Sequence, residues 1–113
     1  MNPKIDDLYF LFRKKWTVCL LVDLHMGSKK FQDFKKNLPD ISPKVLYQTL
    51  NDLEEMGLVE KKIITEKPKS TEYQLTENGK LSKDFIKEYF FFLTKVSSDS
   101  RVHEKILKEI QDL

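Results

Sequence analysis

Residues 41–57 read ISPKVLYQTLNDLEEMG, and this stretch predicts one helix with both of its ends marked. Ser42 can cap the first backbone amides, and Pro43 suits the first helical position. Gly57 supplies the left-handed residue with which many helices end. Apolar residues recur at helical spacing and predict a single buried stripe, made of Val45, Leu46, Leu50, Leu53 and Met56.

The opposite face of this predicted helix is polar. It carries Lys44, Tyr47, Gln48, Asn51 and Asp52, of which the first four can donate hydrogen bonds. These four crowd the N-terminal half, which usually reads base edges when a helix enters the DNA major groove. They are therefore candidate base-contacting residues. An ordinary amphipathic surface helix would show the same pattern, so this stretch alone leaves both interpretations open.

The composition favours one soluble, folded domain. The chain has 113 residues, 34% of them charged and 40% hydrophobic, which is enough for one modest core. Its net charge is only +2. Residues 28–70 hold nine lysines and seven acids, so the whole excess lies around the predicted helix. A solvated face explains so small an excess nearly as well as a nucleic-acid partner does.

The sequence offers little for redox, metal or membrane chemistry. Cys19 is the only cysteine, so no internal disulfide forms, and its aliphatic neighbours predict a small core residue. His25 lies near a predicted helix C-terminus, where a partly positive ring is favoured, and His103 is distant. We therefore expect no metal and no cofactor. No signal peptide and no apolar run of about 20 residues is present, so we expect a cytoplasmic chain without a membrane partner.

Elements on either side place the helix of residues 41–57 in a larger pattern. Residues 29–31 suit a very short strand, residues 31–37 a helix, and Pro39-Asp40 a turn. Two helices at this separation form a helix-turn-helix pattern, although a structural helical hairpin would look much the same. Residues 58–65 and 71–76 then predict two strands joined by the polar loop 66–70. Lys67 and Lys69 in that loop would meet phosphates or the minor groove, unless the loop is a plain solvated turn.

The terminal segments carry more apolar side chains than one small domain can bury. Helices are expected over residues 3–12, 16–26 and 77–96, and a last one carries Val102, Ile106, Ile110 and Leu113. In residues 77–96 the stripe from Leu81 to Val96 would suffice for the domain's own core. A second subunit is the expected cover for the surplus, although an aromatic cluster can also line a ligand pocket. The predicted dimer-interface residues are Leu8, Tyr9, Phe12, Ile86, Tyr89, Phe90 and Leu93.

These pieces together resemble the winged-helix transcriptional regulators of the HxlR type. The matching segments are KWT at 15–17, FQDFKKNLP at 31–39, ISPKVL at 41–46, LNDLEEMGLV at 50–59 and EYQLTENG at 72–79. The resemblance covers roughly residues 5 to 95 in uninterrupted order. It implies a mainly α fold with a small β-hairpin, a homodimer joined through its terminal helices, and a two-fold DNA operator. It also implies that helix 42–56 enters the major groove with the hairpin loop beside it.

Two departures from the family pattern bear on mechanism. Many members carry a sensing cysteine shortly before the first helix, where this chain has Asn2-Pro3, so thiol sensing is not expected. Members often carry arginines at the loop tip and at the position of Asn51. The lysines found here hold phosphate as point charges but lack bidentate guanine recognition, so the loop should position more than it specifies.

The sequence thus predicts one domain over residues 1–113, with a core at about 15–80 and dimerisation helices at about 3–12 and 77–113. Its partners would be double-stranded DNA, a second copy and an unidentified small-molecule effector. A winged helix that binds another protein instead of DNA is the alternative. An enzyme has little support, because no catalytic triad, metal spacing or glycine-rich phosphate loop is present. The predicted backbone-contacting residues are Lys29, Lys30, Lys35, Lys36, Ser42, Lys67 and Lys69.

Overall fold

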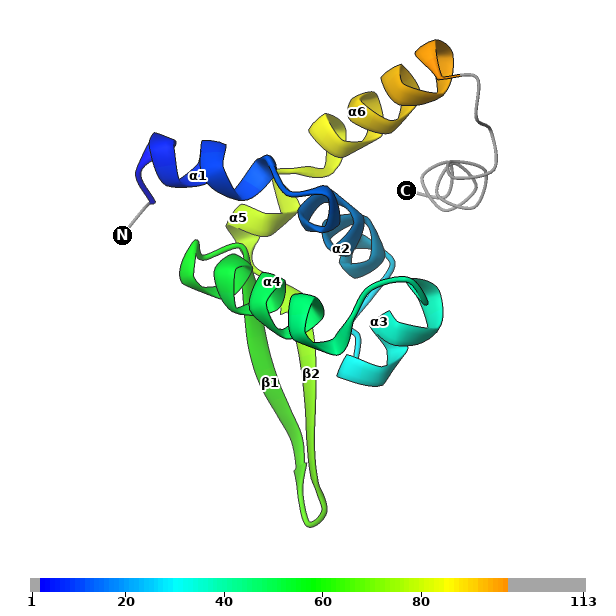
Figure 1. The fold of residues 1–113 in the computed structure, drawn as a ribbon. Helices are drawn as coiled ribbons and strands as arrows, with labels where there is room; N and C mark the ends of the chain where they lie inside the picture. The colour runs from blue at the N-terminus through cyan, green and yellow to red at the C-terminus, as the bar shows by residue number, and fades with distance from the viewer. Residues whose placement is uncertain (1–2, 98–113) are drawn as a thin grey trace.

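The computed structural model describes residues 3–97, and these form six helices and one antiparallel hairpin (Figure 1). The predicted last helix lies outside the described residues. The elements, in chain order, are α1 (Ile5–Phe12), α2 (Lys15–His25), α3 (Phe31–Asn37), α4 (Pro43–Glu55), β1 (Val59–Glu66), β2 (Lys69–Leu75), α5 (Glu77–Lys80) and α6 (Lys83–Val96). None of the helices in residues 3–97 combines the length and apolarity that crossing a bilayer requires.

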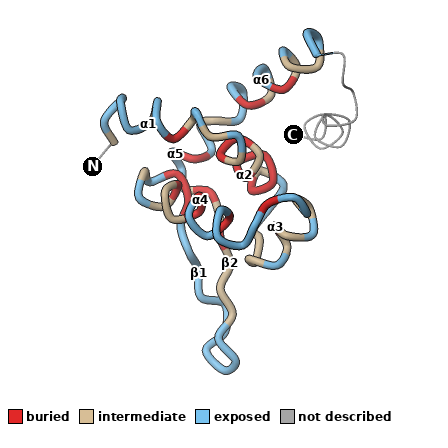
Figure 2. The backbone as a smooth tube through the Cα atoms, viewed as in Figure 1, coloured by how far each residue is buried: buried red, intermediate tan, exposed pale blue. Residues whose placement is uncertain are grey.

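Helix α2 lies at the centre of the fold, as its nearly continuous apolar sequence predicts. Leu20, Leu21 and Val22 are fully buried, and α2 contacts α1, α3, α4, α6 and β2. Figure 2 shows the buried backbone gathered on α2 and on the inner side of α4. This arrangement leaves the outer side of α4 and most of the hairpin in solvent, which is where a macromolecular partner could reach them.

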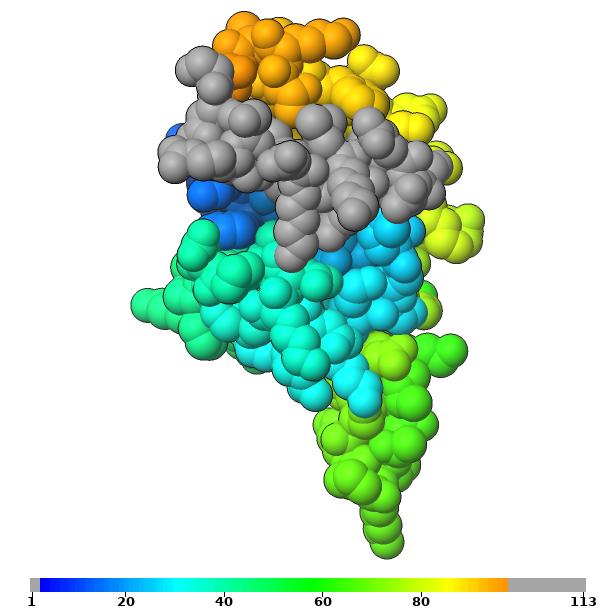
Figure 3. Space-filling model, turned by 90° about the vertical axis from the view of Figure 1, so that its right-hand side faces the viewer, coloured from blue at the N-terminus to red at the C-terminus, as the bar shows by residue number. Residues whose placement is uncertain are grey.

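The hairpin projects well beyond the helical body (Figure 3). Its strands pair from Val59↔Leu75 at the base to Glu66↔Lys69 at the tip, with a bulge between Ile63 and Thr65. Strand β1 lies one residue further along the chain than predicted and β2 begins two residues earlier, so the loop shrinks from residues 66–70 to Lys67 and Pro68. An isolated bridge between Lys29 and Tyr73 ties the start of α3 to β2, in agreement with the short strand expected at residues 29–31.

The prediction of one continuous helix over residues 77–96 was wrong, because the chain breaks between α5 and α6. Thr76 caps α5 by accepting the Gly79 amide at 3.1 Å. Gly79 packs so closely on the hairpin base that an added Cβ would lie 2.0 Å from the Leu58 carbonyl oxygen. The Ser82 hydroxyl then donates to the Gly79 carbonyl at 2.7 Å, which satisfies an acceptor near the end of this short turn.

The break also decides which side of α6 faces the core, and this differs from the sequence-based assignment. Ile86 and Phe90, expected at a subunit interface, are buried within the chain itself. The stripe that was expected to pack inward is the exposed one: Leu81 79%, Phe85 50%, Tyr89 38%, Phe92 63% and Val96 67%. Phe85 contacts Phe12 of α1 edge to face at 5.6 Å between ring centres, so the exposed apolar side chains of α1 and α6 are neighbours.

Candidate nucleic-acid interface

Helix α4 begins and ends as its sequence predicts. The Ser42 hydroxyl oxygen accepts the Val45 amide at 3.1 Å, and Pro43 follows at the first helical position. Gly57 has a φ of +74°, the left-handed conformation that glycine adopts without strain. Leu46, Leu50 and Leu53 fill the core with no exposed surface. These contacts hold α4 in a fixed orientation, so its outer face presents a fixed set of side chains.

The four predicted base-contacting residues lie together on that outer face. Lys44 and Gln48 are exposed, Tyr47 is 56% exposed, and Asn51 is half-buried. Val45 also lies on the surface at 37% exposure, so its assignment to the buried stripe was wrong. Thr49 takes the inner position instead, and its hydroxyl donates to the Val45 carbonyl at 2.7 Å.

Asp52 contributes a negative charge to the same helix, and the structure pairs it. The Lys14 ammonium, at the junction of α1 and α2, lies 3.0 Å from the Asp52 carboxylate. Both side chains are about one-third exposed. A pair this exposed adds little to stability, but it offsets the repulsion that an unpaired carboxylate would exert on a DNA phosphate.

The tip of the hairpin is basic and fully accessible. Lys67 and Lys69 are exposed, and the hydroxyl of Thr65 closes the turn by donating to the Pro68 carbonyl at 2.6 Å. Glu66 pairs with Lys69 across the strands. The tip therefore presents two ammonium groups at the far end of the hairpin, at some distance from α4 (Figure 1).

The four lysines around α3 are not equivalent. Lys36 is exposed, and Lys30 is half-buried with its backbone amide donating to Asp33 at 2.8 Å. The Lys35 ammonium donates to the carbonyl of Ile41, in the turn that leads to α4. The Lys29 ammonium donates to the Gly27 carbonyl at 3.4 Å, and the Lys29 backbone forms two hydrogen bonds with Tyr73, at 3.0 and 2.7 Å. Lys30 and Lys36 are thus better placed for an outside partner than Lys29 and Lys35.

A shallow hollow of 360 Å³, which the sequence does not predict, lies where the start of α3 meets β2. Hydrogen-bond donors dominate its lining, and no carboxylate belongs to it: Lys30, Phe31, Gln32, Lys69, Ser70 and Thr71. Gln32, Ser70 and Thr71 had not been singled out. One feature of the sequence pointed to this contact between α3 and β2, namely the short strand expected at residues 29–31. The pairing of Lys29 with Tyr73 of β2 brings the start of α3 next to that strand.

Two titratable groups lie away from this interface. Cys19 is half-buried, and burial raises the pKa of its thiol, which leaves less of the reactive thiolate. The pKa of His25 is lowered, first by burial and then by the charge of Lys83, so the partly positive ring expected from its helix position was wrong. Within residues 3–97, no cluster of three histidine, cysteine, aspartate or glutamate side chains could hold a metal ion.

Curated relatives match most of the chain. The protein YvaP of Bacillus subtilis, described as an uncharacterized HTH-type transcriptional regulator, is 34% identical over 80 residues, which are 71% of this chain and 74% of YvaP. The HTH-type transcriptional regulator YodB of the same organism is 34% identical over 79 residues, 70% of either chain.

Solved structures of such regulators have the same fold as this chain. The reduced form of YodB superimposes with a TM-score of 0.72 at 28% identity, over 87% of this chain and 96% of YodB. A quinone-bound form of YodB gives 0.68 at 27% identity, over 82% and 98%. The family model described as HxlR-like helix-turn-helix matches residues 11–99. The chain belongs to the HxlR-like helix-turn-helix family.

Proposed function

We infer that the chain acts as a homodimer on a two-fold DNA operator, with α4 in the major groove and the hairpin tip on the backbone or in the minor groove. Membership of the family directly supports part of this: the chain is a winged-helix, DNA-binding transcriptional regulator. What we propose beyond it is which residues meet DNA and how two copies are joined. The observation that carries it is the capped helix α4, held by a buried leucine face and presenting donors outward.

Base readout is assigned to Lys44, Tyr47, Gln48 and Asn51. Gln48 and Asn51 each carry an amide that can pair with both hydrogen-bonding groups of an adenine edge. Lys44 lies in the first turn of α4, the end that points into the groove when a recognition helix docks. Asn51 lies deeper on the helix and is half-buried, so we assign it the base nearest the protein surface.

Backbone contacts are assigned to side chains that flank α4 on both sides. The Ser42 oxygen accepts the Val45 amide, which leaves its hydroxyl hydrogen to donate to a phosphate. Lys35 can reach a phosphate only by giving up its hydrogen bond to Ile41. The ammonium groups assigned to the backbone belong to Lys29, Lys30, Lys35, Lys36, Lys67 and Lys69.

The homodimer is assigned to the exposed apolar surface of α1 and α6. Leu8 and Phe12 of α1 are half-buried on the core, and Tyr9 is 66% exposed. On α6 the interface shifts from Ile86 and Phe90 to the exposed stripe, while Tyr89 and the half-buried Leu93 remain as proposed members. A surface this rich in exposed aromatic residues is typical of subunit contacts.

Selection of bound sites from random duplexes tests this proposal. A two-fold arrangement of half-sites, with centres about 10 base pairs apart or a multiple of that spacing, would support the dimer on DNA. No enriched site, no salt-dependent binding and a monomeric mass would instead favour a protein-interaction module. The same selection repeated with quinones in the buffer tests for a small-molecule effector, since a relative in the family has been solved with a quinone bound.

A further inference from the structure

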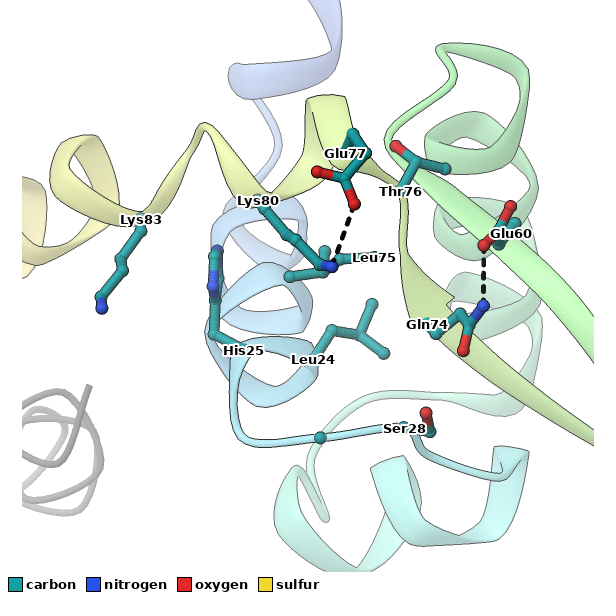
Figure 4. Close-up of a pocket in the computed structure, with 11 residues that line it drawn as sticks. Leu24, His25, Ser28, Glu60, Gln74, Leu75, Thr76, Glu77, Lys80 and Lys83 are labelled. Carbon is teal, nitrogen blue, oxygen red and sulfur yellow. Dashed lines mark hydrogen bonds and ion pairs between the residues drawn. The ribbon is translucent and has the colours of Figure 1, made fainter.

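A pocket of 740 Å³ opens beside the base of the hairpin, and its lining includes none of the residues assigned to DNA or to the dimer (Figure 4). Four parts of the fold meet there: the C-terminal end of α2, the loop after it, the hairpin base, and the α5–α6 junction. None of its lining residues belongs to α4 or to the hairpin tip. Its volume lies within the range of about 300–1,000 Å³ that small-molecule sites occupy.

The lining combines an apolar floor with a polar rim. Leu24 and Leu75 are almost completely buried and form the floor. Four charged side chains and one histidine line the rim, and Figure 4 shows them on three sides of the floor: Glu60, Glu77, Lys80, Lys83 and His25. An occupant would therefore place an apolar body on the leucines and a polar group at the rim.

The charges on the rim are unequally matched. Glu60 accepts from the Gln74 amide at 2.7 Å, and Glu77 pairs with Lys80 at 3.2 Å. Within residues 3–97, Lys83 belongs to no ion pair, and its charge instead acts on His25. Because the partner of Glu60 is a neutral amide, the rim carries one uncompensated negative charge at Glu60 and one uncompensated positive charge at Lys83. A ligand with a single negative charge can be held at Lys83, whereas a second negative charge would be repelled by Glu60.

His25 adds a second group that responds to an anion. Because the Ser82 hydroxyl donates its hydrogen to Gly79, its oxygen accepts from Nε2 of His25, at 3.1 Å. Nδ1 is then the nitrogen that takes up a proton. Burial and Lys83 both disfavour that proton, and an anion held at Lys83 would favour it.

We propose that this pocket binds a small organic monocarboxylate with an apolar body, and that its occupancy regulates DNA binding. The regulatory half rests on the proposed function. An occupant would contact Gln74 at the hairpin base and Lys83 at the start of α6 together. It would thereby change the position of the hairpin, which is proposed to meet DNA, relative to α6, which is proposed to join the subunits.

Titration of the full ¹⁵N-labelled chain with benzoate and hexanoate tests the site without DNA. We expect saturable shifts at Ser28, the Gln74 side-chain amide and Leu75, together with a rise in the His25 pKa. Benzamide and hexanamide, which have the same shapes without the charge, should shift these signals little. Equal effects of acid and amide, the same shifts with inorganic phosphate, or no saturation in the millimolar range would overturn the site.

Matched variants locate the charge that matters. Lys83→Gln should weaken benzoate binding about tenfold, the size of one lost charge-assisted hydrogen bond. Lys87→Gln, one turn further along α6 and outside the lining, should leave it unchanged. Undiminished binding by Lys83→Gln would contradict the assignment.

Operator affinity measured with and without benzoate then tests regulation. A change in the wild type that Lys83→Gln lacks supports it, and binding of benzoate without any change of operator affinity overturns the regulatory half. Absence of DNA binding under all conditions would overturn the proposed function, while the ¹⁵N titration would still decide the site.

Discussion

Among the exposed residues of α4, Gln48 is the one whose chemistry is most specific for a base. Its amide can donate and accept in the plane of an adenine edge, whereas Lys44 offers only donors and Tyr47 one hydroxyl. Gln48 also lies on the exposed face of the helix. In the proposed complex, base readout is therefore concentrated on α4, and the lysines of the hairpin tip, which carry no base-specific geometry, position the complex on the DNA backbone.

Gln48→Ala should change sequence preference while largely preserving affinity for unrelated DNA. Loss of a bidentate pair removes about 1–3 kcal/mol of discrimination at one base position and leaves phosphate contacts in place. Repeating the site selection with the variant would show relaxed preference at one position per half-site. An unchanged site logo would contradict the assignment of Gln48.

Lys67→Ala should weaken binding to every sequence about equally. Removing one phosphate contact lowers the slope of log affinity against log salt by about 0.9 per subunit, because one fewer counterion is released. Anisotropy titrations of operator and random duplex over a salt series measure both effects. Lys95→Ala, at the far end of α6, is the control and should leave the slope unchanged. A slope that stays constant in Lys67→Ala would remove the hairpin tip from the interface.

At the scale of single elements, the ends of a helix could be predicted from the sequence only where nearby residues determine them. Both ends of α4 are encoded by residues at the ends themselves, Ser42, Pro43 and Gly57, and these agree with the structure. The break after α5 has no such local mark. Beside the break, Gly79 approaches the Leu58 carbonyl, which is a contact between segments about twenty residues apart. Contacts of this kind cannot be read from local sequence, and neither can the stripe of α6 that faces the core.

The candidate nucleic-acid interface likewise has features that the sequence predicts and features that it does not. Helical spacing alone separates Lys44, Tyr47 and Gln48 from the buried leucines, so their exposure was predictable. Two other features could not be predicted: the hydrogen bond from Lys35 to Ile41, and the hollow lined by Gln32, Ser70 and Thr71. Both depend on a turn path or on strand pairing, which the order of residue types does not specify.

Gly79→Ala should destabilise the fold although alanine is the better helix former. A Cβ 2.0 Å from a backbone oxygen requires α5 or the hairpin base to move, and forced shifts of this kind cost typically about 1–3 kcal/mol. Chemical unfolding followed by circular dichroism measures the loss. Lys80→Ala, in the same helix but exposed, is the control and should change stability by less than about 0.5 kcal/mol. Equal stability of the two variants would contradict the close approach.

At the scale of the whole molecule, the proposed function gives separate tasks to the exposed surface of α1 and α6, which would join two subunits, and to the exposed face of α4, which would read DNA. Ile5, Tyr9 and Phe10 of α1 are each more than half exposed, and Phe85 of α6 lies against Phe12. Joining two copies through this surface would fix the separation of their α4 helices. The half-site spacing of an operator then reports the geometry of the dimer, which single residues on α4 do not determine.

Phe92→Glu should separate the subunits without unfolding them. Phe92 is 63% exposed in the single chain, so a carboxylate there is solvated in the monomer but would be buried without a partner in the dimer. We expect association at least about a hundredfold weaker, judged from a desolvation cost of several kcal/mol, with an unchanged circular dichroism spectrum.

Sedimentation velocity across a concentration series measures the association. Ile63→Glu, which replaces an exposed apolar residue of the hairpin (52% exposed), should remain dimeric. If monomeric Phe92→Glu bound an operator of two half-sites as tightly as the wild type, the coupling of the reading helices through α1 and α6 would be wrong. The proposed geometry instead requires that Phe92→Glu loses tight binding to the two-half-site operator when it loses the dimer, while it still binds a single half-site weakly.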